Sequence, residues 1–421
     1  MKKINRKTNM KKIVLTVTTA GLITGLIGVS GCNISNKDKA KIINTINKEH
    51  ESGLDDTIAM MKEVEQRYLN NYVDDIDYEQ VKYYTVNAMI QAFGDKYGAY
   101  LDEEHVDIID NKLTNSVKGI GVLIRAEINE DKDYDQLYVI DVYADSGAEK
   151  AGLKTGDIIT KVNEKSFKFN EELTFDNLIR NEIKGSIGTT CTITYIDNKD
   201  NKEKTVEVER SDVKTTSVKY EKINNNIGYI KINEFGINTV EEFKTALDYM
   251  LDNNINKVVF DLRGNSGGLL DSAKAMIDCF LPEMDALYIT DKDGNIEEVQ
   301  RTKNNNEYNI SGVCLVNNKT ASAAELFTQT LHDYGLAKTI GEKTVGKGTV
   351  CSVEPTTDGG ELSLSSNRYQ IFNHTEIEGK GVTIDYELKL PEEKQKIDYK
   401  LPLSEDDLVQ KAIEVINETE E

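Results

Sequence analysis

Short apolar runs alternate with amphipathic segments of helical length between about residues 215 and 395. The runs Lys257–Leu262 and Val313–Val316 are apolar on both faces through their centres. Such strands are typical of a parallel sheet that helices cover on both sides. Between them, residues Thr239–Leu251 carry apolar side chains at helical spacing. The pattern predicts an α/β core, which we assign to residues 213–395.

The rest of the chain divides into segments with different patterns. Residues 32–110 begin with polar residues and continue with apolar residues at helical spacing, which predicts a tether followed by helices. Residues 111–212 contain short runs of alternating apolar and polar residues, typical of a small β-rich domain. Residues 396–421 predict a C-terminal helical tail whose helix is opened by Ser404. We therefore expect an α/β multidomain protein with a helical N-terminal segment and a β-rich domain beside the core.

The charge of the chain restricts its partners. The formal net charge is -22 at pH 7, although the first 31 residues carry six basic and no acidic side chains. A surface this acidic repels the phosphates of nucleic acids, so we expect no DNA or RNA partner. It also repels anionic lipid, and attachment to a membrane therefore requires an anchor.

The N-terminus has the pattern of such an anchor. A basic start is followed by the apolar stretch Ile13–Val29 and then by Ser30-Gly31-Cys32. A basic region, an apolar core and small residues before a cut predict a secretory signal peptide, here residues 1–31. The small residues before Cys32 resemble the lipobox of bacterial lipoproteins, in which this cysteine is lipidated. We expect a protein anchored through Cys32 at the outer face of the bacterial cytoplasmic membrane; the alternatives are an ordinary signal peptide and an uncleaved anchor.

The other cysteines and the acidic turns indicate neither disulfides nor metals. The four cysteines after Cys32 are far apart in the sequence, and we interpret most of them as small buried apolar residues. Residues 197–200 and 291–294 are rich in aspartate but lack the complete calcium-loop pattern, so they are predicted to be hairpin turns. We expect no metal and no cofactor.

Two features of the β-rich segment indicate peptide binding. The stretch Gly119-Ile120-Gly121-Val122 can turn several backbone N–H groups toward one point, a nest that suits a carboxylate. Residues Ser146–Ile159 predict a short helix, a turn and a strand, and Leu173–Ile183 a second helix. Together these closely resemble a PDZ domain, whose groove captures an extended peptide by strand addition and holds its terminal carboxylate. The resemblance implies that residues 119–122 bind the C-terminus of a protein or peptide.

Ser322 lies where the buried strand Val313–Val316 gives way to a predicted helix. At such a junction backbone N–H groups point outward and the helix dipole favours negative charge, an arrangement that suits an oxyanion. A serine at the start of a helix is common, so this feature by itself does not indicate catalysis.

The motifs around Ser322 are more specific. In chain order they are Asp261-Leu262-Arg263-Gly264-Asn265-Ser266-Gly267-Gly268, Thr320-Ala321-Ser322-Ala323-Ala324-Glu325 and Gly346-Lys347-Gly348-Thr349-Val350. This set resembles the C-terminal processing peptidases, also called tail-specific proteases, which are serine peptidases with an inserted PDZ domain. The resemblance extends from Phe93-Gly94-Asp95 to Gly379-Lys380-Gly381-Val382, nearly the whole mature chain. It implies a ClpP/crotonase-like protease core.

The resemblance implies that Ser322 is the nucleophile and Lys347 the general base. A lysine used as a base must be neutral, and burial among apolar neighbours such as Val345 and Val350 favours the neutral form. Gly346 and the glycine after Lys347 allow the backbone to approach closely.

The oxyanion hole would be formed by the backbone N–H of Ala323 and that of either Gly267 or Gly268. The function implied is that of an extracytoplasmic serine endopeptidase, which recognises the C-terminus of a protein substrate through the PDZ domain and cleaves peptide bonds by a Ser-Lys mechanism. The sequence leaves a homo-oligomer open.

Two residues depart from the family pattern. Ser266 stands where the family often has proline, and Cys351 stands where it usually has the glutamine that orients the lysine. The second departure puts catalytic efficiency in doubt. The alternative is therefore a catalytically weak or inactive PDZ-bearing lipoprotein that only binds peptides, although the presence of both Ser322 and Lys347 favours the peptidase.

Two other kinds of site are excluded by position. His332 lies about ten residues along the helix that follows Ser322, or about 15 Å away at the rise of an α-helix, so it cannot be the base. Residues 341–348 nearly match a phosphate-binding loop. However, Gly348 stands where that loop needs a hydroxyl, and residues 349–353 predict a strand where a helix is required.

Overall fold

The computed structural model describes residues 54–128, 133–170, 173–303 and 308–418, so the predicted signal peptide and Cys32 lie outside the described residues. The chain divides into two compact units: Met1–Leu101 with Ser352–Leu364, and Asp102–Cys351 with Ser365–Glu421. Within the described ranges, no helix combines the length and the apolar character needed to cross a membrane.

The first unit contains the two predicted N-terminal helices, α3 (Asp55–Asn71) and α4 (Tyr78–Ala92), and the short strand β1 (Ala99–Leu101). Asp77 caps α4, because its side chain accepts hydrogen bonds from two backbone N–H groups of the first turn. The apolar residues that predicted α3 do recur at helical spacing, but none of the residues of this helix is buried. The apolar face of α3 is therefore not covered by the rest of the unit.

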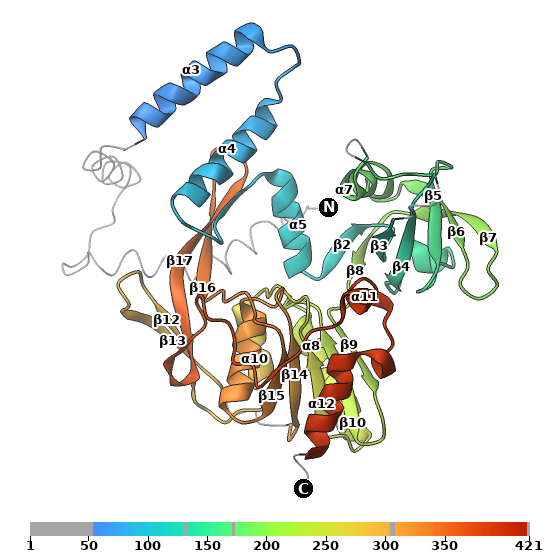
Figure 1. Cartoon of the computed structure of the whole chain (residues 1–421), viewed down its shortest axis with the longest axis vertical. Helices are drawn as coiled ribbons and strands as arrows, with labels where there is room; N and C mark the ends of the chain where they lie inside the picture. Colours follow the sequence, from blue (N-terminus) through green and yellow to red (C-terminus); the bar gives the residue numbers. More distant parts are fainter. Residues whose placement is uncertain (1–53, 129–132, 171–172, 304–307, 419–421) are drawn as a thin grey trace, which may run out of the picture. The chain divides into compact units, whose positions relative to one another are not determined.

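The core of the second unit is the predicted α/β sheet (Figure 1). Its strand order is β19-β15-β14-β11-β10-β9, and all neighbours are parallel except β9 and β10. The strands are β9 (Val218–Lys222), β10 (Ile227–Ile232), β11 (Lys257–Asp261), β14 (Ser311–Val316), β15 (Ala337–Gly341) and β19 (Tyr386–Glu387). Both runs predicted as buried strands, now β11 and β14, are central in this order.

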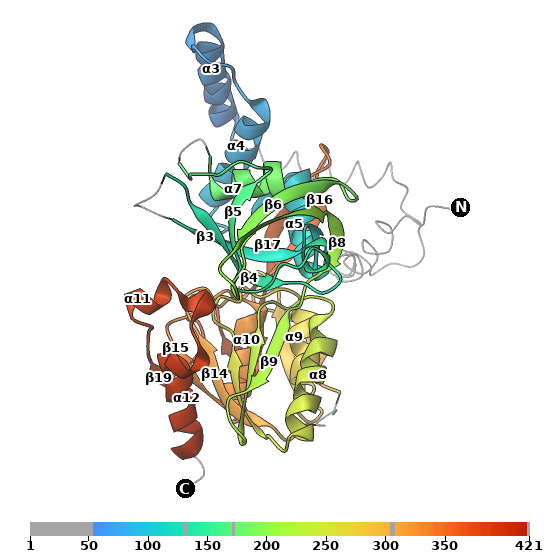
Figure 2. The same ribbon diagram turned by 90° about the vertical axis from the view of Figure 1, so that its right-hand side faces the viewer.

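Helices cover both faces of this sheet, as Figure 2 shows. On one face lie α8 (Thr239–Asp252), α9 (Leu270–Ile277) and α10 (Ala323–Asp333). Successive residues of β11 point to opposite sides: Val258 and Phe260 belong to the cluster that contains these helices, whereas Val259 packs with α12 (Asp407–Glu418). This alternation explains why the strand is apolar on both faces.

A second, mostly antiparallel sheet is built around the long strand β17 (Glu361–Ile371). The other strands are β1, β12 (Asp285–Thr290), β13 (Ile296–Arg301), β16 (Thr349–Pro355) and β18 (Thr375–Glu376). The strand β16 begins directly after Gly348, which confirms that no helix follows Lys347 and excludes the phosphate-binding loop.

The β-rich domain is a five-stranded antiparallel sheet in the order β3-β4-β5-β6-β7. Its strands are β3 (Val122–Glu127), β4 (Gln136–Val142), β5 (Ile158–Val162), β6 (Thr190–Ile196) and β7 (Glu203–Glu209). The predicted helices are present as α6 (Gly147–Lys150) and as α7 (Phe175–Leu178), which continues into a π-helical turn, Ile179–Ile183. Residues 197–200 and 291–294 form hairpin turns, as predicted.

A two-stranded ribbon of β2 (Ser116–Gly119) and β8 (Ser211–Lys214) carries this domain, since one strand enters it and the other leaves it. The helix α5 (Glu103–Leu113) precedes the ribbon. Among the described cysteines, Cys191, Cys279 and Cys314 are buried, which agrees with their interpretation as apolar core residues.

The C-terminal tail begins with α11 (Glu392–Gln395) and two short 3-10 turns and ends with α12. The prediction that Ser404 opens the last helix is wrong. Ser404 lies in the 3-10 turn Leu403–Glu405, and α12 begins at Asp407 after the buried Asp406. The Asp406 carboxylate accepts hydrogen bonds from the N–H groups of Leu408 and Val409, so Asp406 caps the helix.

Candidate active site

The loops that follow β11 and β14 meet at one edge of the core sheet, because the two strands are parallel neighbours. The Ala321 N–H donates to the Asn265 carbonyl oxygen at 3.0 Å. The buried Thr320 hydroxyl donates to the Leu262 carbonyl oxygen at 2.9 Å. The motif around Arg263 and the motif around Ser322 are therefore joined directly.

Ser322 occupies an unusual backbone conformation directly before α10. Its φ is 56° and its ψ is -121°, in a region that residues other than glycine rarely adopt. The residue is 9% exposed. Strain of this kind persists only where the surrounding structure fixes it, and it is concentrated at functional sites.

Two glycines of the first loop leave no space for a side chain, and Gly267 approaches the Ser322 turn closely. A Cβ atom on Gly267 would lie 2.8 Å from the Ser322 Cβ atom and 3.0 Å from the Ala323 nitrogen, and one on Gly268 would lie 2.3 Å from the Phe235 carbonyl oxygen. Both glycines also have φ in the left-handed region, at 96° and 144°. No other residue fits at either position.

The backbone N–H groups of these glycines differ in their partners. The Gly267 N–H donates to the Asn265 side-chain oxygen at 2.8 Å. Among the described residues, by contrast, neither the Gly268 N–H nor the Ala323 N–H has an acceptor. The N–H of Ala323, directly after Ser322, and that of Gly268 thus remain available. Because the Gly267 N–H is already paired, Gly268 fits an oxyanion hole better than Gly267 among the two predicted alternatives.

A fully buried carboxylate, that of Glu325, connects the Ser322 turn with the Lys347 loop. One oxygen, Oε2, accepts the N–H of Ser322 at 2.8 Å and that of Lys347 at 2.9 Å. The other, Oε1, accepts the Thr344 hydroxyl at 2.6 Å and the Gly346 N–H at 2.7 Å. The carboxylate is therefore saturated with donors, as a buried charge requires.

The hydroxyl of Tyr369, on β17, makes a second connection between the same two segments. This buried hydroxyl lies 2.8 Å from the Lys347 carbonyl oxygen and 3.3 Å from the Ser322 carbonyl oxygen. Because it has one proton, it donates mainly to the nearer carbonyl. Two further hydrogen bonds fix the surroundings. The Tyr369 N–H donates to the Gly348 carbonyl oxygen, and the Gly348 N–H donates to the Glu378 carboxylate.

The surroundings of Lys347 differ in part from the prediction. Lys347 is half-buried and Val350 packs against the main core cluster, as expected. Val345, the other apolar neighbour expected to bury the lysine, is 41% exposed. Its N–H donates to the Thr320 carbonyl oxygen at 3.0 Å. Cys351 lies on β16 and is half-buried.

The predicted carboxylate nest forms the turn between β2 and β3. Gly121 has a φ of 81°, and a Cβ atom there would lie 2.2 Å from the Ser146 Cβ atom, so glycine is required. The carbonyl groups of Ile120 and Gly121 accept hydrogen bonds from Ala148 and Tyr143. Their N–H groups have no acceptor among the described residues. Since β3 is the last strand of its sheet, its outer edge can pair with a further strand.

Comparison with known proteins agrees with this geometry. A family model of peptidase family S41 matches residues 226–388, and a PDZ-domain model matches residues 119–209. A CtpA-like serine protease of Staphylococcus saprophyticus is 30% identical over 399 residues, which cover 93% of this chain and 75% of the relative. A CtpA-like serine protease of Staphylococcus aureus is 32% identical over 348 residues, 81% of this chain and 67% of the relative.

The chain belongs to the C-terminal processing peptidases of family S41. It is a serine-type peptidase that carries a PDZ domain. An S41 protease of Bacteroides fragilis has the same fold, with a TM-score of 0.56 at 19% identity over 83% of this chain and 93% of that structure. The α/β fold class and the inserted PDZ domain predicted from the sequence are confirmed.

The sequence of this peptidase did not predict the connecting roles of two residues, Glu325 and Tyr369. Glu325 was quoted as part of a motif without a role, because its partners Thr344, Gly346 and Lys347 lie about 20 residues further along the chain. Tyr369 belongs to none of the quoted motifs. The acidic residue three positions after Ser322, in a stretch that folds as the first turn of a helix, was the one available signal.

A buried ion cluster supports the loop that contains the two glycines. Asp261, which is 1% exposed, pairs with Arg263 at 2.6 Å and Lys231 at 3.1 Å, and the same arginine reaches Asp406 at 2.8 Å. Burial by itself would raise the pKa of Asp261, but the charges of Arg263 and Lys231 hold it well below its usual range. The cluster thereby fixes the start of the loop.

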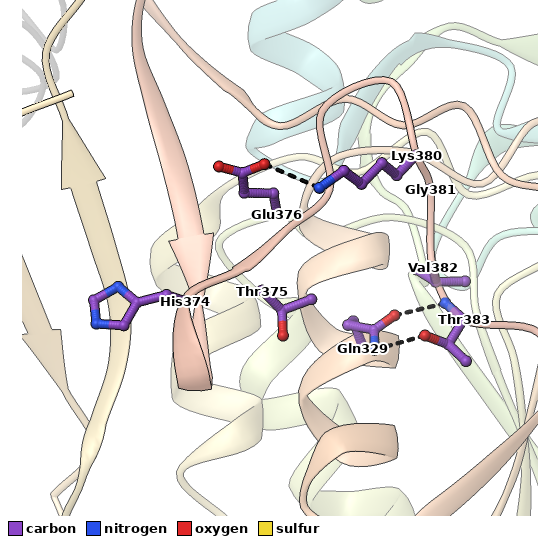
Figure 3. Close-up of a pocket in the computed structure, with 8 residues that line it drawn as sticks. All are labelled: Gln329, His374, Thr375, Glu376, Lys380, Gly381, Val382 and Thr383. Atoms are coloured by element: carbon purple, nitrogen blue, oxygen red, sulfur yellow. Dashed lines mark hydrogen bonds and ion pairs between the residues drawn. The ribbon is translucent and has the colours of Figure 1, made fainter. Parts of the chain in front are cut away.

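A pocket of about 600 Å³ lies between α10 and the segment that follows β17 (Figure 3). The polar groups that line it are already paired. Gln329 accepts the Thr383 N–H at 2.6 Å and donates to the Thr383 hydroxyl at 3.1 Å, and Lys380 pairs with Glu376 at 3.0 Å. Neither Ser322 nor Lys347 lines this pocket, which gives no indication of a ligand.

Proposed function

We propose that this peptidase is an extracytoplasmic endopeptidase in which Ser322 is the nucleophile and Lys347 the general base. One observation supports the assignment above all others: a single oxygen of Glu325 accepts the backbone N–H groups of both residues. That shared acceptor holds the two backbones close together, as a nucleophile and its base require.

In this proposal the neutral amine of Lys347 takes the hydroxyl proton of Ser322 as the serine oxygen attacks the substrate carbonyl carbon. The resulting oxyanion accepts hydrogen bonds from the N–H groups of Ala323 and Gly268. The lysine then passes the proton to the leaving amine, and a water molecule, deprotonated by the same lysine, hydrolyses the acyl-enzyme. No metal or cofactor takes part in any of these steps.

The proposed substrates are proteins with an accessible C-terminus. The N–H groups of Ile120 and Gly121 would bind the terminal carboxylate, and the residues before it would pair with the outer edge of β3. For the location, we propose lipid anchoring at Cys32 on the outer face of the cytoplasmic membrane. This proposal rests on the sequence of the N-terminus, which lies outside the described residues.

The second candidate is a weakly active or inactive protein that binds peptides through its PDZ domain. Cys351 favours it, because a thiol is shorter and a weaker hydrogen-bond partner than the glutamine usual in the family. Against it stand the strained Ser322 and the saturated Glu325, features that a protein without catalysis does not need.

Cleavage of an unstructured peptide with an apolar, free C-terminus tests the assignment. Ser322→Ala and Lys347→Ala should each lower kcat at least about 1000-fold with the fold retained. Lys343→Ala, in an exposed lysine of the same loop, is the control and should be neutral. Activity that survives Lys347→Ala would mean that another base exists. Amidation of the peptide C-terminus should raise KM, and equal rates on acid and amide would exclude carboxylate recognition.

A further inference from the structure

Asn115 lies at the root of the ribbon that carries the PDZ domain and is enclosed completely. It directly precedes β2, and its carbonyl oxygen accepts the N–H of Thr215, the residue after β8. Its side chain is 0% exposed, and its φ of 49° lies in the left-handed region. A buried polar side chain on a strained backbone must be fixed by its partners.

Those partners lie in the loop between β10 and α8. The Asn115 amide nitrogen donates to the Glu234 carboxylate at 2.9 Å, and the amide oxygen accepts the Asn238 N–H at 2.9 Å. Between these contacts lies Gly236, on which a Cβ atom would be only 2.2 Å from the Asn115 side-chain oxygen. The loop is thus shaped around the asparagine side chain, and glycine leaves the space for it.

The same loop is hydrogen-bonded to residues 267–269, the loop that contains the two glycines. The Phe235 N–H donates to the Gly267 carbonyl oxygen at 3.1 Å, and the Leu269 N–H donates to the Phe235 carbonyl oxygen at 2.7 Å. Phe235 therefore pairs with Gly268 as two neighbouring strands do. The backbone of Gly268 lies so close to Phe235 that a Cβ atom on Gly268 would be 2.3 Å from the Phe235 carbonyl oxygen. A shift of residues 234–238 must therefore also move the Gly268 N–H.

A second contact joins the segment before the ribbon to the loop that contains Gly267 and Gly268. Lys112, at the end of α5, donates to the Ser266 hydroxyl at 2.6 Å. Ser266 stands where the family often has proline, and a proline has no hydroxyl to accept this bond. The segment before the ribbon thus reaches the glycine loop directly as well as through Glu234.

We propose that Asn115 is a positioning residue that couples the ribbon of the PDZ domain to the oxyanion loop. The nest at residues 119–122 follows Asn115 at the other end of β2, so a peptide carboxylate and the Gly268 N–H are connected through one short strand and one buried amide. The proposal rests on the proposed function, in which Gly268 is an oxyanion donor. Asn115 itself acts only through the loop.

An exchange of side chains tests the hydrogen bond without emptying the space. In Asn115→Asp the new carboxylate still accepts the Asn238 N–H but faces the carboxylate of Glu234. In the double variant Asn115→Asp with Glu234→Gln, the glutamine amide donates to the aspartate, so the bond is restored with reversed polarity. Glu234→Gln alone keeps an oxygen that can accept from Asn115, and it serves as the control.

Kinetics on the free-acid peptide should separate these variants. We expect kcat to fall about tenfold or more in Asn115→Asp, to return within about threefold of wild type in the double variant, and to be unchanged in Glu234→Gln. KM and the peptide Kd on a Ser322→Ala background should stay constant, because the nest is intact. A purely structural role would lower Tm and leave kcat of the folded enzyme unchanged.

Hydrogen exchange on the Ser322→Ala protein provides a readout that does not depend on cleavage. Binding of the free-acid peptide should change exchange at the Phe235 and Leu269 amides. The response should be absent in Asn115→Asp and present again in the double variant. A double variant that behaves like Asn115→Asp, or a response that survives in Asn115→Asp, would overturn the coupling. Failure of wild type to cleave would instead contradict the proposed function and leave the exchange result valid.

Discussion

At the scale of single residues, the candidate site depends on groups that hold the reacting residues and do not themselves react. The Tyr369 hydroxyl lies within hydrogen-bond distance of the carbonyl oxygens of both Ser322 and Lys347. Tyr369→Phe removes this hydroxyl and nothing else, at a cost of about 0.5–1.5 kcal/mol in the free energy of unfolding. We expect kcat to fall about tenfold with KM unchanged, because the substrate does not meet the hydroxyl.

Tyr288→Phe is the matched control for that variant. Tyr288 lies on β12, opposite the neighbour of Tyr369 on β17, and its hydroxyl is 3.4 Å from the Asp285 carboxylate. The control should leave kcat unchanged. Equal losses in the two variants would show that Tyr369 contributes to the sheet alone.

Cys351 concerns the efficiency of the proposed base. A glutamine at this position could hold the lysine amine through its amide, which a thiol does only weakly. General-base catalysis contributes about 10²–10⁴-fold and depends on that geometry. We therefore expect Cys351→Gln to raise kcat and Cys351→Ala to lower it less than about tenfold, measured on the same peptide. Complete loss in Cys351→Ala, with inhibition by alkylation of Cys351, would make the cysteine the nucleophile.

At the scale of elements, the last helix shows where the sequence pattern is sufficient and where it is not. The apolar spacing gives α12 correctly, but the predicted cap, Ser404, is wrong, and Asp406 caps the helix instead. Arg263, which is far from Asp406 in the sequence, pairs with the Asp406 carboxylate at 2.8 Å and holds it at the start of α12. Strands β11 and β14 and helices α8 and α10 were predicted closely, because their apolar patterns depend on burial alone.

The two candidate caps can be compared directly. Asp406→Ala removes the cap and one partner of a buried arginine, so we expect it to lower the free energy of unfolding by about 2–3 kcal/mol. Ser404→Ala should change it by less than about 0.5 kcal/mol, because Ser404 is exposed. Urea unfolding followed by circular dichroism measures both. Similar values for the two variants would contradict the assignment of the cap.

At the scale of the whole molecule, the sequence predicts the fold class but not the contacts that make a site. The motifs around Arg263, Ser322 and Lys347 indicate that a site exists. The sharing of Glu325, the choice of Gly268 over Gly267 and the enclosure of Asn115 depend on distances between segments far apart in the chain. The spacing of apolar residues along the sequence says nothing about distances between such segments, so these features are visible only in the structure.

The first unit, the PDZ domain and the α/β core each contain an aspartate whose pKa is lowered. Hydrogen bonds from Thr356 and Tyr100 lower the pKa of Asp358 in the helical unit. The Lys204 side chain and the Lys199 backbone lower the pKa of Asp197, in the PDZ domain, to about 2. In the core, Arg263 and Lys231 lower the pKa of Asp261 despite its burial. All three parts should therefore lose stability in acid.

The core provides the sharpest test of this acid sensitivity. Because the pKa of Asp261 is lower in the folded chain than its value of about 3.9 in the unfolded chain, its stabilising contribution is present above about pH 4 and is lost as the pH falls below it. Asp261→Asn should thus be strongly destabilised at pH 7, and the difference between its free energy of unfolding and that of wild type should shrink between about pH 5 and pH 2.

The chain contains no tryptophan, so unfolding is followed by circular dichroism. Asp252→Asn, at the exposed end of α8, should match wild type at every pH. A difference between Asp261→Asn and wild type that stays constant with pH would mean that the carboxylate contributes through its shape and not through its charge.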